Sequence, residues 1–306
     1  MQNTFFRYLF IFLSLSLLSY AQKNLNPKYT RDVGKEIVTD HRTKLMWQDN
    51  NQTTRLRKVW VSEDNYNLGQ YADSSGDTAM SYCENLTLGG YEDWRLPSVK
   101  ELSSIVDVHS YDSSINEVFL HKKSQAYWTA TNSIDSNDSA WQVKFYSGKV
   151  EGITSKYLAL YVRCVRGENE KSNFNKSSNI VKDMSSNLQW QDNALSAKMS
   201  WELAVEYCKK LRLDGFEDWR LPNRKELFSL VDYGKQKPSI QPQFKHTFFG
   251  YYWTSTTYTS HTLSKYTTLQ DHSIYAWSIS FLSGDVHTNK KKYTYSVRCV
   301  RAKRPL

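Results

Sequence analysis

An internal duplication is the feature that most constrains how this chain folds. Four motifs occur twice and in the same order: WQDN, EDWRLP, YWT and VRCVR start at residues 47, 92, 127 and 162 and again at 190, 217, 252 and 297. Eight of the ten Trp residues fall into matched pairs, at 47/190, 94/219, 128/253 and 141/277. Because Trp is rare, chance does not produce this match, and the chain is read as two copies of one structural unit.

The duplication predicts two domains, which a length of 306 residues also favours. We place the first copy at 35–167, the second at 179–303, and a polar linker at 168–178 between them. Each copy is too long for a solenoid repeat and has its own apolar segments, so we expect two separately cored domains. With 40% hydrophobic and 14% aromatic residues, the composition excludes disordered and collagen-like classes.

The spacing of the motifs shows where the copies differ. The offset between copies falls from 143 residues at the first Trp pair to 125 at EDWRLP, so the first copy has 18 extra residues within 51–77. The offset then rises to 136 at the last Trp pair, so the second copy has 11 extra residues within 258–275. We expect both insertions to be surface loops, where binding specificity usually lies.

Apolar periodicity predicts two helices in each copy. Residues 200–211 present an apolar face at helical spacing, with a Ser at the N-cap position, and residues 79–86 repeat that face. A second helix follows each EDWRLP motif and begins with a capping box, at 98–101 and 223–226.

Further along each copy the pattern changes to a period of two. Apolar and polar residues alternate over Trp141–Phe145 and Trp277–Phe281, as in half-buried strands, and a Ser-Gly turn follows each segment. The VRCVR motif forms the last strand of each copy. The prediction is therefore an α+β fold of two tandem domains, each with two helices and an antiparallel sheet.

Each copy contains two of the four Cys residues, and four Cys allow three pairings. The duplication favours one disulfide within each copy, Cys83 with Cys164 and Cys208 with Cys299. A bridge that closes a loop of this length contributes about 4 kcal/mol in the chain-entropy model. A zinc site is the alternative, but the sequence lacks the short C-x-x-C spacing and companion His residues. We expect no metal and no cofactor.

The N-terminus has the layout of a secretory signal peptide. Residues 1–21 hold one charge, Arg7, an apolar stretch, and small residues at the positions that precede a cleavage site. The alternative is an uncleaved membrane anchor. We expect export to the periplasm, the outer surface or the medium, with no transmembrane span after cleavage.

The ordered motifs W-Q-D, E-D-W-R-L-P-x-x-x-E-L, Y-W-T-[AS]-T, W-x-[VI]-x-F-x-x-G and V-R-C-V-R resemble the Lcl C-terminal domain family, named for a bacterial collagen-like adhesin. The resemblance covers both copies and implies an exported bacterial protein with a fold similar to C-type lectins and formylglycine-generating enzymes. For the founding adhesin it also implies adhesion through sulfated glycosaminoglycans. This chain lacks the Gly-X-Y stalk of that adhesin, so trimerisation does not carry over.

The charge distribution points to a polyanionic partner. The formal net charge is +9, and no acidic residue follows Asp285. We predict a polyanion-binding surface from the basic residues of this C-terminal stretch, joined by a cluster in the first insertion: Lys290, Lys291, Lys292, Arg298, Arg301, Lys303 and Arg304, with Arg55, Arg57 and Lys58. The alternative is that these residues are a solvated, charged chain end without a ligand. Aromatic residues of the two insertions would suit sugar stacking: Tyr66, Tyr71, Tyr258 and Tyr266.

Other functions have weaker support in the sequence. A formylglycine-generating type of enzyme needs a pair of closely placed active-site thiols, whereas both Cys residues of each copy are expected to form a structural disulfide, with no second thiol near Cys164 or Cys299. The His residues do not cluster, and we expect no catalytic residues. A calcium-dependent lectin would use residues 73–77 for oxygen ligands, but such a stretch is more often a turn before a helix. We expect no nucleic-acid partner, since no known motif is present. A cell-surface protein is the alternative to an extracellular glycan.

The repeated EDWRLP motif invites a catalytic reading, but a scaffold role is favoured. We expect Trp94 and Trp219 to be buried beside an Asp–Arg pair, Asp93 with Arg95 and Asp218 with Arg220. Glu101 and Glu226 are predicted to be caps. The four Arg residues that flank the last Cys of each copy are candidates to pair with these acids: Arg163, Arg166, Arg298 and Arg301.

Overall fold

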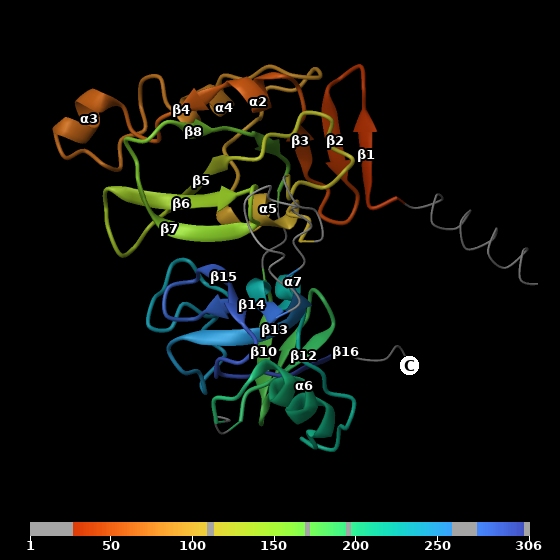
Figure 1. The fold of residues 1–306 in the computed structure, drawn as a ribbon. Helices are drawn as coiled ribbons and strands as arrows, with labels where there is room; N and C mark the ends of the chain where they lie inside the picture. The colour runs from red at the N-terminus through yellow and green to blue at the C-terminus, as the bar shows by residue number, and fades with distance from the viewer. Residues whose placement is uncertain (1–26, 109–112, 169–171, 194–196, 259–273, 303–306) are drawn as a thin grey trace, which may run out of the picture.

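The computed structural model describes residues 27–108, 113–168, 172–193, 197–258 and 274–302. Its fold is α+β, with few helices and mostly antiparallel strands, in two tandem domains. In Figure 1 the first copy forms the upper lobe and the second copy the lower lobe. The predicted signal peptide at 1–21 lies outside the described residues, and within the described ones no helix is long and apolar enough to cross a membrane.

Each domain contains a small antiparallel sheet. Three of its strands come from the start of the domain and the fourth from its end. The sheet of the first domain has the order β1-β2-β3-β9, and that of the second has the order β10-β11-β12-β16. The strands are β1 (Tyr29–Asp32), β2 (Ile37–Asp40), β3 (Met46–Gln48), β9 (Val165–Arg166), β10 (Phe174–Ser177), β11 (Ile180–Asp183), β12 (Leu188–Gln191) and β16 (Val300–Ala302).

The first strand of each small sheet lies before the predicted start of its copy. β1 precedes residue 35, and β10 occupies part of the expected linker at 168–178. An aromatic side chain anchors each strand to its own domain. Tyr29 packs edge-on against Phe119 with ring centroids 6.3 Å apart, and Phe174 packs against Phe244 at 5.8 Å. Each domain is therefore longer at its N-terminal end than the motifs indicate.

The second sheet runs through both domains. Its order is β13-β14-β15-β7-β6-β5-β8-β4, and all neighbours are antiparallel except β5 and β8. The strands are β4 (Arg57–Lys58), β5 (Ala126–Asn132), β6 (Ser139–Lys144), β7 (Lys149–Ser155), β8 (Leu160–Tyr161), β13 (Tyr251–Thr257), β14 (Tyr275–Ser280) and β15 (Val286–Lys290). The domains join where β7 pairs with β15 at Val150 and Val286.

The helices are short and begin where the capping residues predict. They are α2 (Gln52–Arg55), α3 (Glu63–Asn67), α4 (Ala79–Glu84), α5 (Val99–Ser104), α6 (Trp201–Lys210) and α7 (Arg224–Ser229). The capping boxes at the start of α5 and α7 are confirmed. Ser200 holds the N-cap position of α6, although its hydroxyl makes no capping hydrogen bond. The first insertion contains α2, β4 and α3, whereas most of the second, including Tyr266, lies outside the described residues.

The central strands are buried more deeply than an alternating pattern indicates. In β6 the intervening residues Ala140 and Gln142 are buried together with Trp141 and Val143, so the expectation of a half-buried strand is wrong. The Ser-Gly turns after these strands are confirmed, with Gly148 and Gly284 at positive φ.

The expectation of two separate cores is also wrong in part. Each domain has its own hydrophobic cluster around its disulfide, but one larger cluster continues from the first domain into the second. The indole of Trp141 packs edge-on against Tyr233 with ring centroids 4.5 Å apart, and the indole of Trp277 lies against Gly148. Sequence motifs that lie within one copy do not report contacts between copies.

The contacts between the domains repeat about an approximate two-fold axis. Lys100 of α5 donates to the carbonyl of Ser229 at 3.0 Å, and Lys225 of α7 donates to the carbonyl of Ser104 at 3.2 Å. These pairs have the offset of 125 residues that separates the copies. In Figure 1, α5 and α7 lie between the lobes. The geometry is that of an isologous dimer interface, made within one chain.

Both predicted disulfides are confirmed. Cys83 of α4 bonds Cys164, and Cys208 of α6 bonds Cys299, with Cα atoms 5.5 and 5.4 Å apart. No Cys of the chain is free. Each bridge ties the first long helix of a domain to the strand that closes it.

The close approach of Trp277 to Gly148 gives a test of the domain interface. A Cβ atom at Gly148 would lie 3.1 Å from the Trp277 ring, whereas one at Gly69, which has nearly the same φ, meets nothing within 4 Å. We expect Gly148→Ala to lower the free energy of unfolding by about 1–3 kcal/mol more than Gly69→Ala, because it adds overpacking to the same backbone strain. Urea denaturation measures both losses. Equal losses would contradict the packing described for this interface.

Candidate functional site

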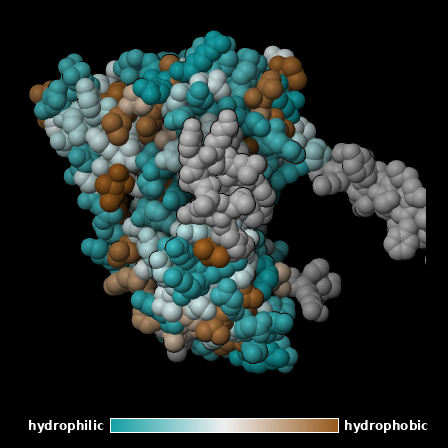
Figure 2. Space-filling model, in the orientation of Figure 1, coloured by the Kyte–Doolittle hydropathy of each residue, from teal (hydrophilic) through white to brown (hydrophobic). Residues whose placement is uncertain are grey.

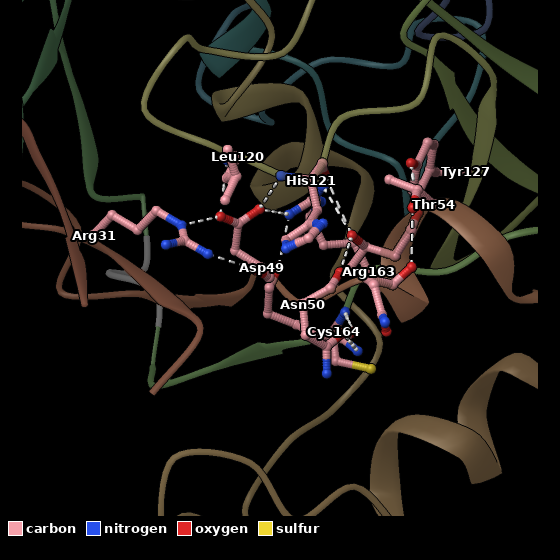
Figure 3. Close-up of polar contacts among 12 residues, drawn as sticks. Arg31, Asp49, Asn50, Thr54, Leu120, His121, Tyr127, Arg163 and Cys164 are labelled. Carbon is pink, nitrogen blue, oxygen red and sulfur yellow. Dashed lines mark hydrogen bonds and ion pairs between the residues drawn. The ribbon is translucent and has the colours of Figure 1, made fainter. Parts of the chain in front are cut away.

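A buried carboxylate follows the repeated W-Q motif in each domain and organises its interior. In the first domain Asp49 is fully buried and forms ion pairs with Arg31 at 2.5 Å and with Arg163 at 3.2 Å. The backbone N–H groups of Leu120 and His121 also donate to it, at 2.9 and 3.1 Å (Figure 3). All of these donors point inward, so this network serves the scaffold and leaves no room for a ligand.

The second domain repeats this network around Asp192. Arg298 lies 3.1 Å from its carboxylate, Lys176 forms a second ion pair, and the backbone N–H groups of Lys245 and His246 donate at 2.9 and 3.0 Å. Burial alone would raise the pKa of Asp192, but the hydrogen bond from Lys176, the backbone donors and the charge of Arg298 outweigh it and lower the pKa to about 2. The carboxylate is therefore ionised wherever the protein is folded near neutral pH.

The Arg residues beside the last Cys divide between two kinds of partner. As expected, Arg166 pairs with Asp93 at 2.7 Å and Arg301 pairs with Asp218 at 2.6 Å. Arg163 does not pair with the EDWRLP acids but with the Asp of the W-Q-D motif, and Arg298 does likewise.

The Arg residues of the EDWRLP motif pair with the capping acids, so the expected pairs of Asp93 with Arg95 and of Asp218 with Arg220 are wrong. Arg95 reaches Glu101 at 2.6 Å and Arg220 reaches Glu226 at 2.7 Å, so these carboxylates cap a helix and hold an Arg at once. Trp94 and Trp219 are buried, as predicted.

The predicted polyanion-binding residues do not form one surface. Arg298 and Arg301 are only 3% and 6% exposed, so they belong to the interior. Lys303 and Arg304 lie outside the described residues. Arg298 and Arg301 both pair with acids that are distant in the chain, which the run of basic residues in the sequence did not reveal.

The basic cluster of the first insertion is also separate. Arg55 and Arg57 are exposed, and Lys58 pairs with Asp77. β4 carries Arg57 and Lys58 at the far edge of the large sheet, separated from β15 by four strands. The structure therefore does not bring this cluster to the C-terminal lysines.

The three consecutive lysines do surround a hollow in the second domain. Lys290, Lys291 and Lys292, together with Glu202 and Ile274, line a space of about 500 Å³, which we call the lysine hollow. Lys290 and Lys292 take part in none of the ion pairs among the described residues. Lys291 lies over the ring of Trp201 with its ammonium 4.3 Å from the centroid.

The first domain has the same lysine–tryptophan contact. Lys156 lies 4.4 Å from the ring centroid of Trp60. The Trp60 indole donates to the carbonyl of Thr129 at 2.9 Å, and the Trp201 indole donates to that of Thr254 at 2.8 Å. Trp60 and Trp201 are thus a fifth matched pair, which the first insertion hides in the sequence.

The first insertion covers the contact between Lys156 and Trp60. Lys156 is 2% exposed and donates to the carbonyls of Tyr71 and Asn137, both at 2.7 Å. Tyr66 packs against Tyr71 and Tyr157, with ring centroids 5.1 and 5.5 Å apart. Tyr66 and Tyr71 therefore close the structure and do not form an open sugar-stacking platform. Among the described residues, the hollow is open in the second domain and covered in the first.

The duplicated scaffold agrees with the comparison with known families. A family model described as the Lcl C-terminal domain matches residues 36–166 and, a second time, residues 179–301. This chain belongs to the Lcl C-terminal domain family. A search of curated proteins finds no match to the chain.

The possible calcium loop of the first Lcl C-terminal domain is a turn. The carboxylate of Asp73 accepts the backbone N–H of Ser75 at 2.8 Å, and Asp77 pairs with Lys58. The segment leads into α4 through the N-cap residue Thr78. This confirms the prediction of a turn before a helix. Among the described residues, no three acidic, His or Cys side chains converge as metal ligands do.

The buried carboxylate of the second Lcl C-terminal domain gives a test of the scaffold. We expect Asp192→Asn to lower the free energy of unfolding by about 3–5 kcal/mol, because it leaves Arg298 buried without its counter-charge. The control is Asp93→Asn, in a pair whose carboxylate side chain is 61% exposed, with an expected loss of about 0–1 kcal/mol.

The depressed pKa of Asp192 also sets the pH dependence of the stability that Asp192→Asn loses. Because the folded pKa of about 2 lies below the ordinary 3.8, the ionised carboxylate stabilises the fold above about pH 4. Its contribution decreases as the pH falls from there towards 2. The stability difference between wild type and Asp192→Asn should narrow over that range in denaturant titrations. A difference that stays constant would show that the carboxylate is not the stabilising charge.

Proposed function

We propose that this chain is an exported bacterial binding protein that recognises polyanionic glycans through the lysine hollow, without catalysis of its own. The observation that carries the proposal is the contrast between the two copies. At the same place in the fold, the first domain encloses one lysine beneath its insertion, whereas the second presents three lysines around an open hollow.

The charge of the hollow supports an anionic ligand. Glu202 is the one acidic residue among those that line it, and Lys291 is held in position by Trp201. Lys290 and Lys292 keep their ammonium groups outside every ion pair of the described residues, so they are available to sulfate or carboxylate groups. A repeating polyanion supplies such groups at regular spacing, which suits a row of lysines at the end of β15.

The cysteine chemistry supports binding over catalysis of the formylglycine-generating type. That reaction needs free thiols, and all four Cys residues of this chain form disulfides within their domains. The disulfides are compatible with an exported protein. The lectin-like relation of the fold and the adhesive role belong to this proposal, and they rest on membership of the Lcl C-terminal domain family.

The surface around the described residues is consistent with a polar ligand. Figure 2 shows hydrophilic residues over most of the visible face, with hydrophobic residues scattered among them. On that face no broad apolar surface competes with a charged site as the place for a partner.

Replacing Lys290 and Lys292, which form none of the ion pairs among the described residues, tests the proposal. We expect Lys290→Gln with Lys292→Gln to lower the affinity for heparin about tenfold at low salt, which corresponds to about 1.4 kcal/mol. Lys291 is left in place because it packs on Trp201. Retention of residues 22–306 on a heparin column over a salt gradient measures the effect, since binding by exposed charges weakens with ionic strength.

The control is a second pair of exposed lysines. Lys122→Gln with Lys123→Gln removes the same charge from the first domain, away from the hollow. This variant should elute close to wild type. Equal elution of the two double variants would show that heparin responds to net charge alone, and the lysine hollow would then not be the binding site.

A further inference from the structure

A second cationic space lies between the two domains. It has a volume of about 210 Å³ and is enclosed by α5, α7 and the turn between β2 and β3. Four cationic side chains line it: Arg42, Lys100, Arg224 and Lys225. We call this space the interdomain pocket. It is distinct from the lysine hollow, with which it shares no lining residue.

The approximate two-fold axis of the domains passes through this pocket. Lys100 and Ser104 contribute from α5, and their counterparts Lys225 and Ser229 contribute from α7. Each ammonium donates to one carbonyl of the opposite helix, which uses one of its three N–H donors. The pocket therefore brings the charge and the remaining donors of two lysines to one space from opposite sides.

Arg224 adds a buried charge that the first domain lacks. Its guanidinium lies 4.8 Å from the ring centroid of Trp277. Its side chain is 1% exposed and donates to the carbonyl of Gly148 at 2.7 Å. The Nε atom has no hydrogen-bond partner among the described residues, and no described ion pair involves this guanidinium. The equivalent residue of the first domain is Val99, at the offset of 125 residues. A buried charge without a counter-charge is costly, so its presence in one copy calls for an anion.

The protein does not supply that anion from the pocket walls. Glu101 is the one acidic lining residue, and Arg95 and the N–H of Ser98 already bind its oxygens at 2.6–2.8 Å. Burial lowers the pKa of Lys100 to about 8, although Asp232 and Asp183 act in the opposite direction. Burial and the neighbouring cation Lys28 lower the pKa of Lys225 to about 8 as well. The shift of Lys100 reflects its burial, and that of Lys225 reflects neighbouring cations as well.

We propose that the interdomain pocket binds a small tetrahedral oxyanion, namely inorganic phosphate or the phosphate group of a monoester, between Lys100, Lys225 and Arg224. A phosphate group carries close to two negative charges near neutral pH and accepts hydrogen bonds in several directions at once. That matches donors that reach the pocket from two opposed helices. The hydroxyl groups of Ser103, Ser104 and Ser229 also line the pocket. A bound oxyanion would hold the two domains together across their two-fold axis.

Calorimetric titration of residues 22–306 with inorganic phosphate tests this proposal. Thermal unfolding in phosphate and in chloride at equal ionic strength provides a second readout, because a ligand of the folded state raises the midpoint. Wild type should bind phosphate and unfold at a higher temperature in its presence. Lys100→Gln with Lys225→Gln should weaken binding at least tenfold, whereas Lys122→Gln with Lys123→Gln should bind as wild type does.

Arg224→Val separates binding from folding, because Val is the residue of the other copy. This variant should fold without phosphate, as shown by its near-ultraviolet circular dichroism, and should lose the phosphate-dependent shift. Titration with inorganic sulfate and with glucose 6-phosphate shows whether the pocket takes oxyanions generally and whether it admits a monoester. No phosphate binding by wild type, or unchanged binding by the Lys100/Lys225 variant, would overturn the proposal. Heparin retention of that variant reports separately on the lysine hollow and should stay as in wild type.

Discussion

Each domain depends on one buried ion pair, between the Asp of the W-Q-D motif and the Arg that precedes the last Cys. The carboxylates of Asp49 and Asp192 are inaccessible to solvent, and each also accepts two backbone N–H groups from a segment more than 50 residues away. Replacing one partner of a buried ion pair is strongly destabilising, because it leaves the other charge buried without compensation. The pair joins the small sheet, the loop before the large sheet and the closing strand. The neighbouring disulfide fixes the same strand to a helix.

A scaffold that is fixed in this way confines the differences between the copies to a few places. The first insertion covers Lys156, whereas the corresponding Lys291 lies beside an open hollow. Arg224 replaces Val99 at the start of the second helix after EDWRLP. Both differences add uncompensated positive charge, one at the surface of the second domain and one between the domains. The copies therefore share most of their interior and differ around Lys156 and Lys291 and at the buried position of Val99 and Arg224.

Sequence reasoning predicted the elements whose signals are local. The capping boxes, the Ser-Gly turns and the helical faces around Cys83 and Cys208 all report on residues within a few positions of one another. The duplication supplied one long-range prediction that succeeded, the disulfide pairing, and the pairing of Arg166 and Arg301 with the EDWRLP acids is another. Trp60 and Trp201 escaped notice because Trp60 lies within 51–77, the segment assigned to the insertion.

The features that sequence reasoning missed depend on tertiary contacts. Burial of Arg298 and Arg301 follows from acids distant in the chain, so their basic character looked like surface charge. The shared core and the interdomain pocket arise where the copies meet, and a comparison of the copies holds no information on that contact. β1 and β10 were missed because one aromatic residue anchors each of them.

The central claim is that an anionic ligand binds at the lysine hollow of the second domain and not at the corresponding place in the first. Hydrogen–deuterium exchange of residues 22–306, with and without a heparin fragment, tests it most directly. The account predicts slower exchange of the amides at 290–293 when the fragment is bound, and no change at 155–158, the corresponding segment of the first domain. Protection at the first-domain segment, or at neither, would contradict the account.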